Sequence, residues 1–123
     1  MVLEPTGTSI VSVVRRFHHT AAEQADAARQ NPDKPYSVAL SRGTLELGFY
    51  SPIGNDKQQP HDRDEVYVIV SGTGRFLNGD SVTEFGPGDA IFVPAGVEHR
   101  FLEFSDDTEM WVVFYGPTGG EGA

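Results

Sequence analysis

The fold of this chain is decided by the stretch QPHDRDEVYVIVSG, residues 59–72. Its second half is a β-branched apolar run that ends at Gly72, a pattern typical of a buried strand closed by a turn. His61 and Glu65 are four residues apart, which puts both side chains on one face of an extended segment. The stretch therefore predicts a strand that carries an imidazole and a carboxylate on the same side.

A second stretch, GPGDAIFVPAGVEH at residues 86–99, delivers another imidazole to a strand. It rises through a short apolar run, turns at a Pro-Ala-Gly sequence and ends at His99. Neutral imidazole and carboxylate suit a divalent first-row metal, and two histidines with one carboxylate are the set that non-heme iron uses with open coordination positions. The two stretches together predict one metal site built from His61, Glu65 and His99.

Both stretches resemble the motifs of the cupin superfamily, G-x5-H-x-H-x3,4-E-x6-G and G-x5-P-x-G-x2-H-x3-N. The second motif is matched at every spacing except its last position, where Glu103 replaces the asparagine; the matching residues are Gly88, Pro94, Gly96 and His99. In the first motif the second histidine, the glutamate and the closing glycine are matched by His61, Glu65 and Gly72.

The first motif also departs from the family pattern, because Gln59 stands where its first histidine is expected and Gly54 lies one residue too close. The motifs span roughly residues 54–103. The resemblance implies an all-β jelly roll, the double-stranded β-helix barrel of cupins, with a metal at the mouth of the barrel. It implies no particular reaction.

Length and composition limit the possible functions. A chain of 123 residues forms one domain and buries a core of ordinary size. Its net charge of −9 argues against binding to nucleic acid or to an anionic membrane surface. With no cysteine, there is no disulfide framework and a metal must be held by nitrogen and oxygen donors.

The chain is expected to begin with a strand at residues 10–17 and a short helix at residues 21–30. Thr20 and Glu23 fit a capping box at the start of this helix, and Asn31-Pro32 ends it. Residues 1–35 are expected to pack on the outside of a barrel formed by residues 36–116. The expected strands of the barrel are residues 37–41, 44–50, 65–71, 75–77, 81–85, 90–93, 97–104 and 110–115.

The ends of the chain suggest its location and its mobility. Residues 1–9 carry no basic residue, and the apolar run at 10–14 is too short for a signal-peptide core or a membrane span, so we expect a cytoplasmic protein. The glycine-rich tail at 117–123 is expected to be flexible. The strand at 65–71 is apolar on both faces, and we expect a homodimer to cover its outer side, with the N-terminal strand or helix as the competing cover.

Several residues near the motifs have more than one interpretation. Gln59 is either a fourth metal ligand through its amide oxygen or a hydrogen-bond partner of bound water. Tyr67 faces the same way as Glu65, and both are candidate catalytic residues. Glu103 shares a face with His99, so it is either a carboxylate that acts as general base or supports the ligands, or a residue at the solvent end of its strand.

These features predict a metal-dependent enzyme that acts on a small organic molecule inside the barrel. The expected cofactor is a divalent transition metal, Fe(II), Mn(II), Ni(II) or Zn(II). Metal-dependent cupins include dioxygenases, lyases and isomerases, and by analogy we favour a dioxygenase. The alternative is a non-catalytic cupin that binds or senses a small ligand and holds a structural metal.

Overall fold

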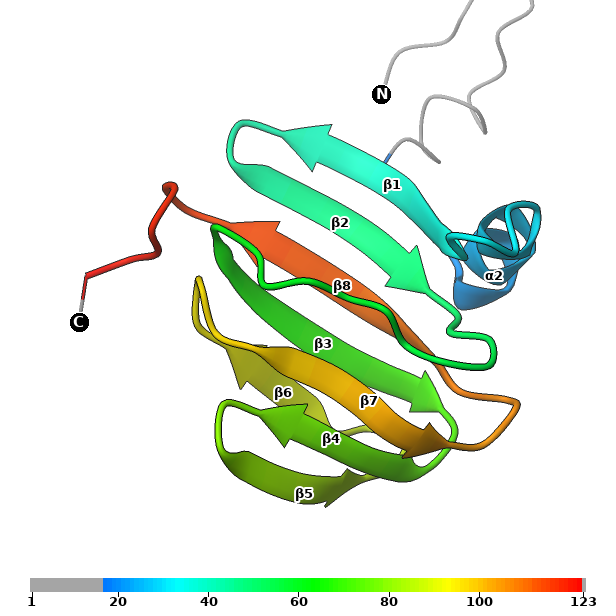
Figure 1. The fold of residues 1–123 in the computed structure, drawn as a ribbon. Coiled ribbons are helices and arrows are strands. Elements are labelled where there is room, and N and C mark those ends of the chain that lie inside the picture. The colour runs from blue at the N-terminus through cyan, green and yellow to red at the C-terminus, as the bar shows by residue number, and fades with distance from the viewer. Residues whose placement is uncertain (1–16, 123) are drawn as a thin grey trace, which may run out of the picture.

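Two antiparallel sheets face each other in the computed structural model, which describes residues 17–122 (Figure 1). The larger sheet has the strand order β1-β2-β8-β3-β6, and the smaller has the order β5-β4-β7. Their bounds are β1 Tyr36–Arg42, β2 Leu45–Tyr50, β3 Asp64–Ser71, β4 Gly74–Asn78, β5 Ser81–Phe85, β6 Ala90–Val93, β7 His99–Phe104 and β8 Glu109–Tyr115. The predicted all-β jelly roll is confirmed.

The observed strands match the predicted ones to within one or two residues. The largest difference is β7, which starts at His99 rather than at residue 97 because Val97 N donates to Pro94 O at 3.3 Å and closes the preceding turn. In the hairpin between β4 and β5, Asn78 pairs with Ser81, so the turn consists of the two residues after Asn78. Gly79 takes φ +63° there, a conformation that favours glycine.

The helix α2 (Ala21–Arg29) packs against β1 and β2. Thr20 Oγ1 accepts from Glu23 N at 3.2 Å and caps the first turn as predicted. The strand predicted for residues 10–17 lies outside the described residues except for Phe17. None of the helices in the described part of the chain is long and apolar enough to cross a membrane.

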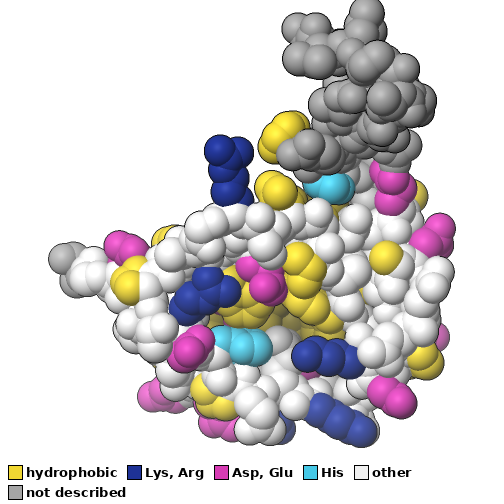
Figure 2. Space-filling model, turned by 90° about the horizontal axis from the view of Figure 1, so that it is seen from above, with side chains coloured by type: hydrophobic (Ala, Val, Ile, Leu, Met, Phe, Trp, Pro, Cys, Tyr) yellow, Lys and Arg dark blue, Asp and Glu magenta, His cyan; other side chains and the backbone are white. Residues whose placement is uncertain are grey.

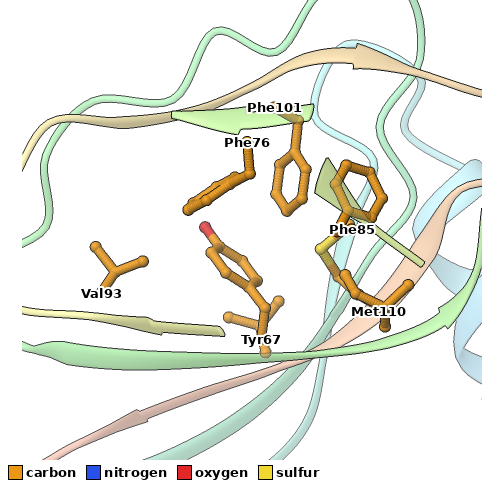
Figure 3. Packing of buried hydrophobic residues seen from close by; sticks show 8 residues of the cluster. Tyr67, Phe76, Phe85, Val93, Phe101 and Met110 are labelled. Atoms are coloured by element: carbon orange, nitrogen blue, oxygen red, sulfur yellow. The ribbon is translucent and has the colours of Figure 1, made fainter. Parts of the chain in front are cut away.

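The core lies between the two sheets and is largely aromatic (Figure 3). Tyr67 from β3 and Met110 from β8 project from the larger sheet toward Phe76 of β4 and Phe101 of β7. The Tyr67 and Phe101 rings meet edge to face with centroids 5.2 Å apart, an arrangement that aromatic quadrupoles favour. This packing holds the strands that carry the metal motifs together.

The segment between β2 and β3 lines a cavity. Figure 1 shows this segment crossing in front of β8, over a part of the larger sheet that the three-stranded sheet leaves uncovered. The cavity has a volume of about 910 Å³ and is lined by residues of this segment together with β1, β2 and β8. From above, Figure 2 shows the hollow with hydrophobic side chains inside it and charged side chains and a histidine around it.

The tail after β8, predicted to be flexible, is hydrogen-bonded to the start of β3. Gly119 N donates to Asp62 O at 2.7 Å, and Glu121 N donates to Asp64 Oδ2 at 2.9 Å. Asp64 Oδ1 also accepts from Ala95 N at 2.9 Å. The two backbone donors lower the pKa of Asp64, whose carboxylate thereby joins the tail to the turn before β7.

On the other side of the larger sheet, several apolar side chains stay exposed. Val68 and Val70 of β3 are each 36 % exposed, and Phe92 of β6 is 49 % exposed. Alternation along β3 places Val68 and Val70 opposite the inward-facing Tyr67 and Ile69. This is the apolar outer face that motivated the expected homodimer, and its cover by a second copy stays a prediction.

Gly72, which closes the first motif, is predicted to be far more sensitive to substitution than Gly88. Both have positive φ, +95° and +87°, but a Cβ on Gly72 would lie 2.4 Å from Thr108 Cα, whereas a Cβ on Gly88 meets nothing within 4 Å. We expect Gly88→Ala to lower the free energy of unfolding by about 1–2 kcal/mol through backbone strain. Gly72→Ala should lower it by clearly more, as measured by urea denaturation, and equal losses in the two variants would contradict this account.

Candidate metal centre

Three side chains of the two motifs meet at the inner end of the cavity. His61 precedes β3, Glu65 is the second residue of β3, and His99 opens β7 of the opposite sheet. One potential ligand atom of each lies within 4.8 Å of the others. His99 Nε2 is 3.3 Å from Glu65 Oε1, and His61 Nε2 is 3.9 Å from the same oxygen. The structure therefore brings together the three residues predicted as ligands.

The donor atoms of this cluster suit a bound cation. Glu65 and His99 are each 1 % exposed. Among the described residues, neither the two oxygens of Glu65 nor Nε2 of His99 has a hydrogen-bond partner. Since a buried ionised carboxylate without a partner costs several kcal/mol, the arrangement requires either a proton on the Glu65–His99 pair or a bound cation. The cluster can thus hold a divalent metal.

The histidines present lone pairs to the centre of the cluster. His99 Nδ1 lies 3.0 Å from Val97 O, and as the donor to this carbonyl it leaves Nε2 as the unprotonated nitrogen facing Glu65. Burial and the neighbouring His99 lower the pKa of His61, which favours its neutral form. The His61 ring is also held edge to face against Phe114, with centroids 4.9 Å apart. The lowered pKa of His61 and the contact of His99 Nδ1 with Val97 O therefore both favour arrangements in which a ring nitrogen can bind a metal.

Glu65 behaves differently from an ordinary surface carboxylate. Its burial raises its pKa to about 8 from the usual 4.5. Without a cation, the folded protein keeps this carboxyl protonated over a range in which the unfolded chain has released the proton. Metal binding and proton binding therefore compete at Glu65.

The predicted fourth ligand, Gln59, is exposed and lines the cavity, while its neighbour Gln58 lies at the cluster. Gln58 Oε1 accepts from Tyr67 Oη at 2.8 Å and is 3.4 Å from His61 Nε2. Sequence reasoning missed Gln58 because it followed the motif spacing, in which Gln59 takes the place of the first histidine, and these residues are not in a strand. The only available signal was an amide side chain three residues before His61, which is too common to single out.

The remaining two candidates are placed very differently. Tyr67 is fully buried below the cluster, and its hydroxyl group points to Gln58. Glu103 is not brought to the cluster: its side chain is 71 % exposed and pairs with Arg75 at 2.7 Å. The expected face was wrong because β7 has a bulge, in which Arg75 pairs with Glu103 but the next residue of β4 pairs with Phe101. Glu103 therefore lies at the solvent side of its strand.

Comparison with known families agrees with this site. Residues 49–115, more than half of the chain, match the family described as the cupin domain. The chain belongs to the cupin superfamily. Both predicted motifs, and the cluster of His61, Glu65 and His99, fall within the matched region.

Individual relatives of this cupin extend the comparison. It is 35 % identical over 97 residues to the uncharacterised protein SCO3923 of Streptomyces coelicolor, covering 77 % of this chain and 92 % of that protein. It is also 36 % identical over 110 residues to an acireductone dioxygenase of Bacillus mycoides, covering 76 % of this chain but 64 % of the dioxygenase. The chain thus spans somewhat less than two thirds of the dioxygenase.

Solved structures support the fold. KdgF from a Halomonas species superimposes with a TM-score of 0.58 at 17 % identity, covering 65 % of this chain and 76 % of that protein. At this level of identity, the likeness concerns the fold alone.

The raised pKa of Glu65 predicts an unusual pH dependence for the metal-depleted cupin. Between pH 4.5 and about 8 the folded state holds a proton that the unfolded state has lost, so this group's contribution to stability falls as pH rises. We expect the melting temperature of the wild type, measured with a chelator present, to fall relative to that of Glu65→Gln as pH rises through this interval. Added divalent metal should reverse the shift at the upper end. A difference that stays constant with pH would contradict the assignment.

Proposed function

We propose that this cupin is a metal-dependent enzyme of the oxygenase type, acting on a small organic molecule bound in the cavity. The observation that carries the proposal is the buried set of donor atoms on Glu65 and His99, which has no partner and lies with His61 beside an open cavity. Fe(II), Mn(II), Ni(II) and Zn(II) all accept this donor set. The similarity to acireductone dioxygenases supports the reaction class.

The number of protein donors favours chemistry over a purely structural metal. Structural sites are usually closed by four protein ligands, whereas catalytic sites keep a position open for water or substrate. His61, Glu65 and His99 supply three, and His61 lines the cavity. A divalent metal bound there supplies Lewis-acid or dioxygen-activating chemistry.

The cavity provides the environment for a small substrate. Its volume of about 910 Å³ lies within the usual range for small-molecule sites. Val112 and Phe114 form an apolar wall, which lowers the local dielectric constant and strengthens polar contacts. The Tyr36 hydroxyl, which donates to Glu46 at 2.7 Å, and the Arg63 guanidinium add polar groups that can orient a substrate.

Each group in the cluster then has a distinct role. Glu65 supplies the negative charge among the three proposed ligands and so reduces the net charge of the metal site. Tyr67 supports the cluster from the core side, since its hydroxyl is directed to Gln58 and its ring is fully buried. We therefore assign Glu65 to the metal and Tyr67 to positioning, and we assign no role in the reaction to Glu103.

Metal content tests the ligand assignment. We expect the wild type, loaded with Fe(II) or Mn(II) and desalted, to retain about one ion per chain by elemental analysis. His61→Ala and His99→Ala should retain at least about tenfold less, because each removes a direct ligand. His18→Ala, which alters an exposed histidine away from the cluster, is the control. The ligand assignment is wrong if both cluster variants keep the metal content of the wild type.

Dioxygen uptake tests the reaction class. With Fe(II)-loaded protein and acireductone, or other small enolisable carbonyl compounds, we expect uptake that Glu65→Gln reduces at least about tenfold. Glu98→Gln, at an exposed acidic residue of the second motif, should leave the rate unchanged. Tight binding of such a compound without any consumption of dioxygen or compound would favour the alternative, a binding or sensing cupin.

A further inference from the structure

The amide of Gln58 is held beside the metal-binding cluster by a buried carboxylate. Asp56, in the segment between β2 and β3, is only 5 % exposed. Its Oδ2 atom accepts from Gln58 Nε2 at 2.9 Å and from Phe101 N at 2.8 Å. Its Oδ1 atom accepts from Tyr50 Oη at 2.8 Å and from Gln58 N at 3.3 Å. Four donors thus fix the carboxylate in place.

These contacts determine which end of the Gln58 amide faces the cluster. An ionised carboxylate can only accept, so the amino group of Gln58 points to Asp56, whose Oδ2 also accepts from Phe101 N. The oxygen of Gln58 is then forced toward Tyr67 and His61. The Tyr67 hydroxyl donates to this oxygen at 2.8 Å.

One lone pair of the Gln58 oxygen stays available. An amide oxygen has two lone pairs, and the Tyr67 hydroxyl uses one of them. The other faces His61 Nε2 at 3.4 Å, which is longer than an ordinary N–H···O hydrogen bond.

The same distance fits two donors around one ion. For metal bonds of ~2.1 Å, tetrahedral and octahedral angles separate neighbouring donors by roughly 3.0–3.4 Å. The distance of 3.3 Å between His99 Nε2 and Glu65 Oε1 falls in the same range.

We propose that Gln58, rather than Gln59, supplies the fourth protein donor to the metal, and that Asp56 is the positioning residue that turns the Gln58 oxygen toward it. This inference rests on the proposed metal site of His61, Glu65 and His99. The resulting set contains two imidazoles, one carboxylate and one neutral amide oxygen. A six-coordinate metal would keep two positions for dioxygen or substrate, so a fourth protein donor leaves the site open, unlike the closed tetrahedral sites of structural zinc.

The test measures binding of Co(II) alone to the full chain. Its affinity is obtained by competition with a chromophoric chelator, and the visible spectrum of bound Co(II) reports the number and type of its ligands. We expect Gln58→Ala to weaken binding at least about tenfold and to change the spectrum. Gln59→Ala is the competing variant, matched in side chain and neighbouring in sequence, and we expect it to change neither.

Asp56→Asn tests the positioning role. The new amide places an N–H group or a weaker acceptor against Gln58, so we expect the spectrum to move in the same direction as in Gln58→Ala. A role limited to folding would lower the melting temperature and leave the spectrum of bound Co(II) as in the wild type. If Asp56→Asn does not fold, Gln58→Ala decides whether Gln58 is a ligand, because Gln58 is partly exposed and its side chain is not part of the hydrophobic core.

The outcomes separate this inference from the proposed function. Wild type that binds no Co(II) would overturn both. Wild type that binds one ion per chain, with Gln58→Ala equal to it in affinity and spectrum, would overturn only the role of Gln58. Loss of affinity in Gln59→Ala with no change in Gln58→Ala would restore the ligand set expected from the motif spacing.

Discussion

The burial of the Glu65 carboxylate is the constraint on which the rest of this structure depends. Glu65 lies on β3, an inner strand of the larger sheet, where it pairs with Val93 on one side and Phe114 on the other. Its side chain cannot turn to solvent without breaking these ladders. A carboxylate fixed in this way must be protonated or must meet a cation, and the sheet opposite brings His99 to within 3.3 Å of it as a second ligand for such a cation. The closure of two sheets therefore creates both the cost of burying the charge and the means of offsetting it.

The segment between β2 and β3 supplies the other half of the site, and its conformation depends on contacts rather than on regular structure. Asp56 attaches it to β7 through Phe101 N, and Gly96 N donates to His61 O at 2.6 Å. The second contact joins the end of this segment directly to the turn of the second motif. His61 is thus placed relative to His99 by the backbone as well as by its ring contacts. A long connection between strands would ordinarily be mobile, and here buried hydrogen bonds make it part of the cavity wall.

The contrast between the regular strands and this irregular segment explains how much of the fold and the site could be predicted from the sequence. Strands and hairpins were predictable because alternation and glycine turns are local, and Glu65, His61 and His99 followed from motif spacing. Gln58 and Asp56 were missed because tertiary hydrogen bonds, not a repeating pattern, decide which amide of residues 58 and 59 faces inward. Glu103 was assigned to the wrong face because alternation assumes an unbroken ladder, whereas the bulge in β7 inserts one residue before it. Sequence patterns thus located the residues that fall at motif spacings, His61 included, and failed for those placed by tertiary hydrogen bonds or by a bulge.

Tyr67 connects the rigid core to this irregular part. Its ring packs against Phe76 and Phe101 of the smaller sheet, with centroids 5.7 and 5.2 Å away. Its hydroxyl, at the other end of the same side chain, fixes the oxygen of Gln58. The Tyr67 side chain has only two rotatable bonds, and its ring is held by two other rings. Its hydroxyl group is therefore fixed next to the cluster at little further cost in conformational entropy. Because metal sites require donors held close to their final positions, a ligand amide on an otherwise irregular segment needs such an anchor. The aromatic core of this cupin therefore does more than stabilise the barrel, since it fixes the geometry of the donors at its mouth.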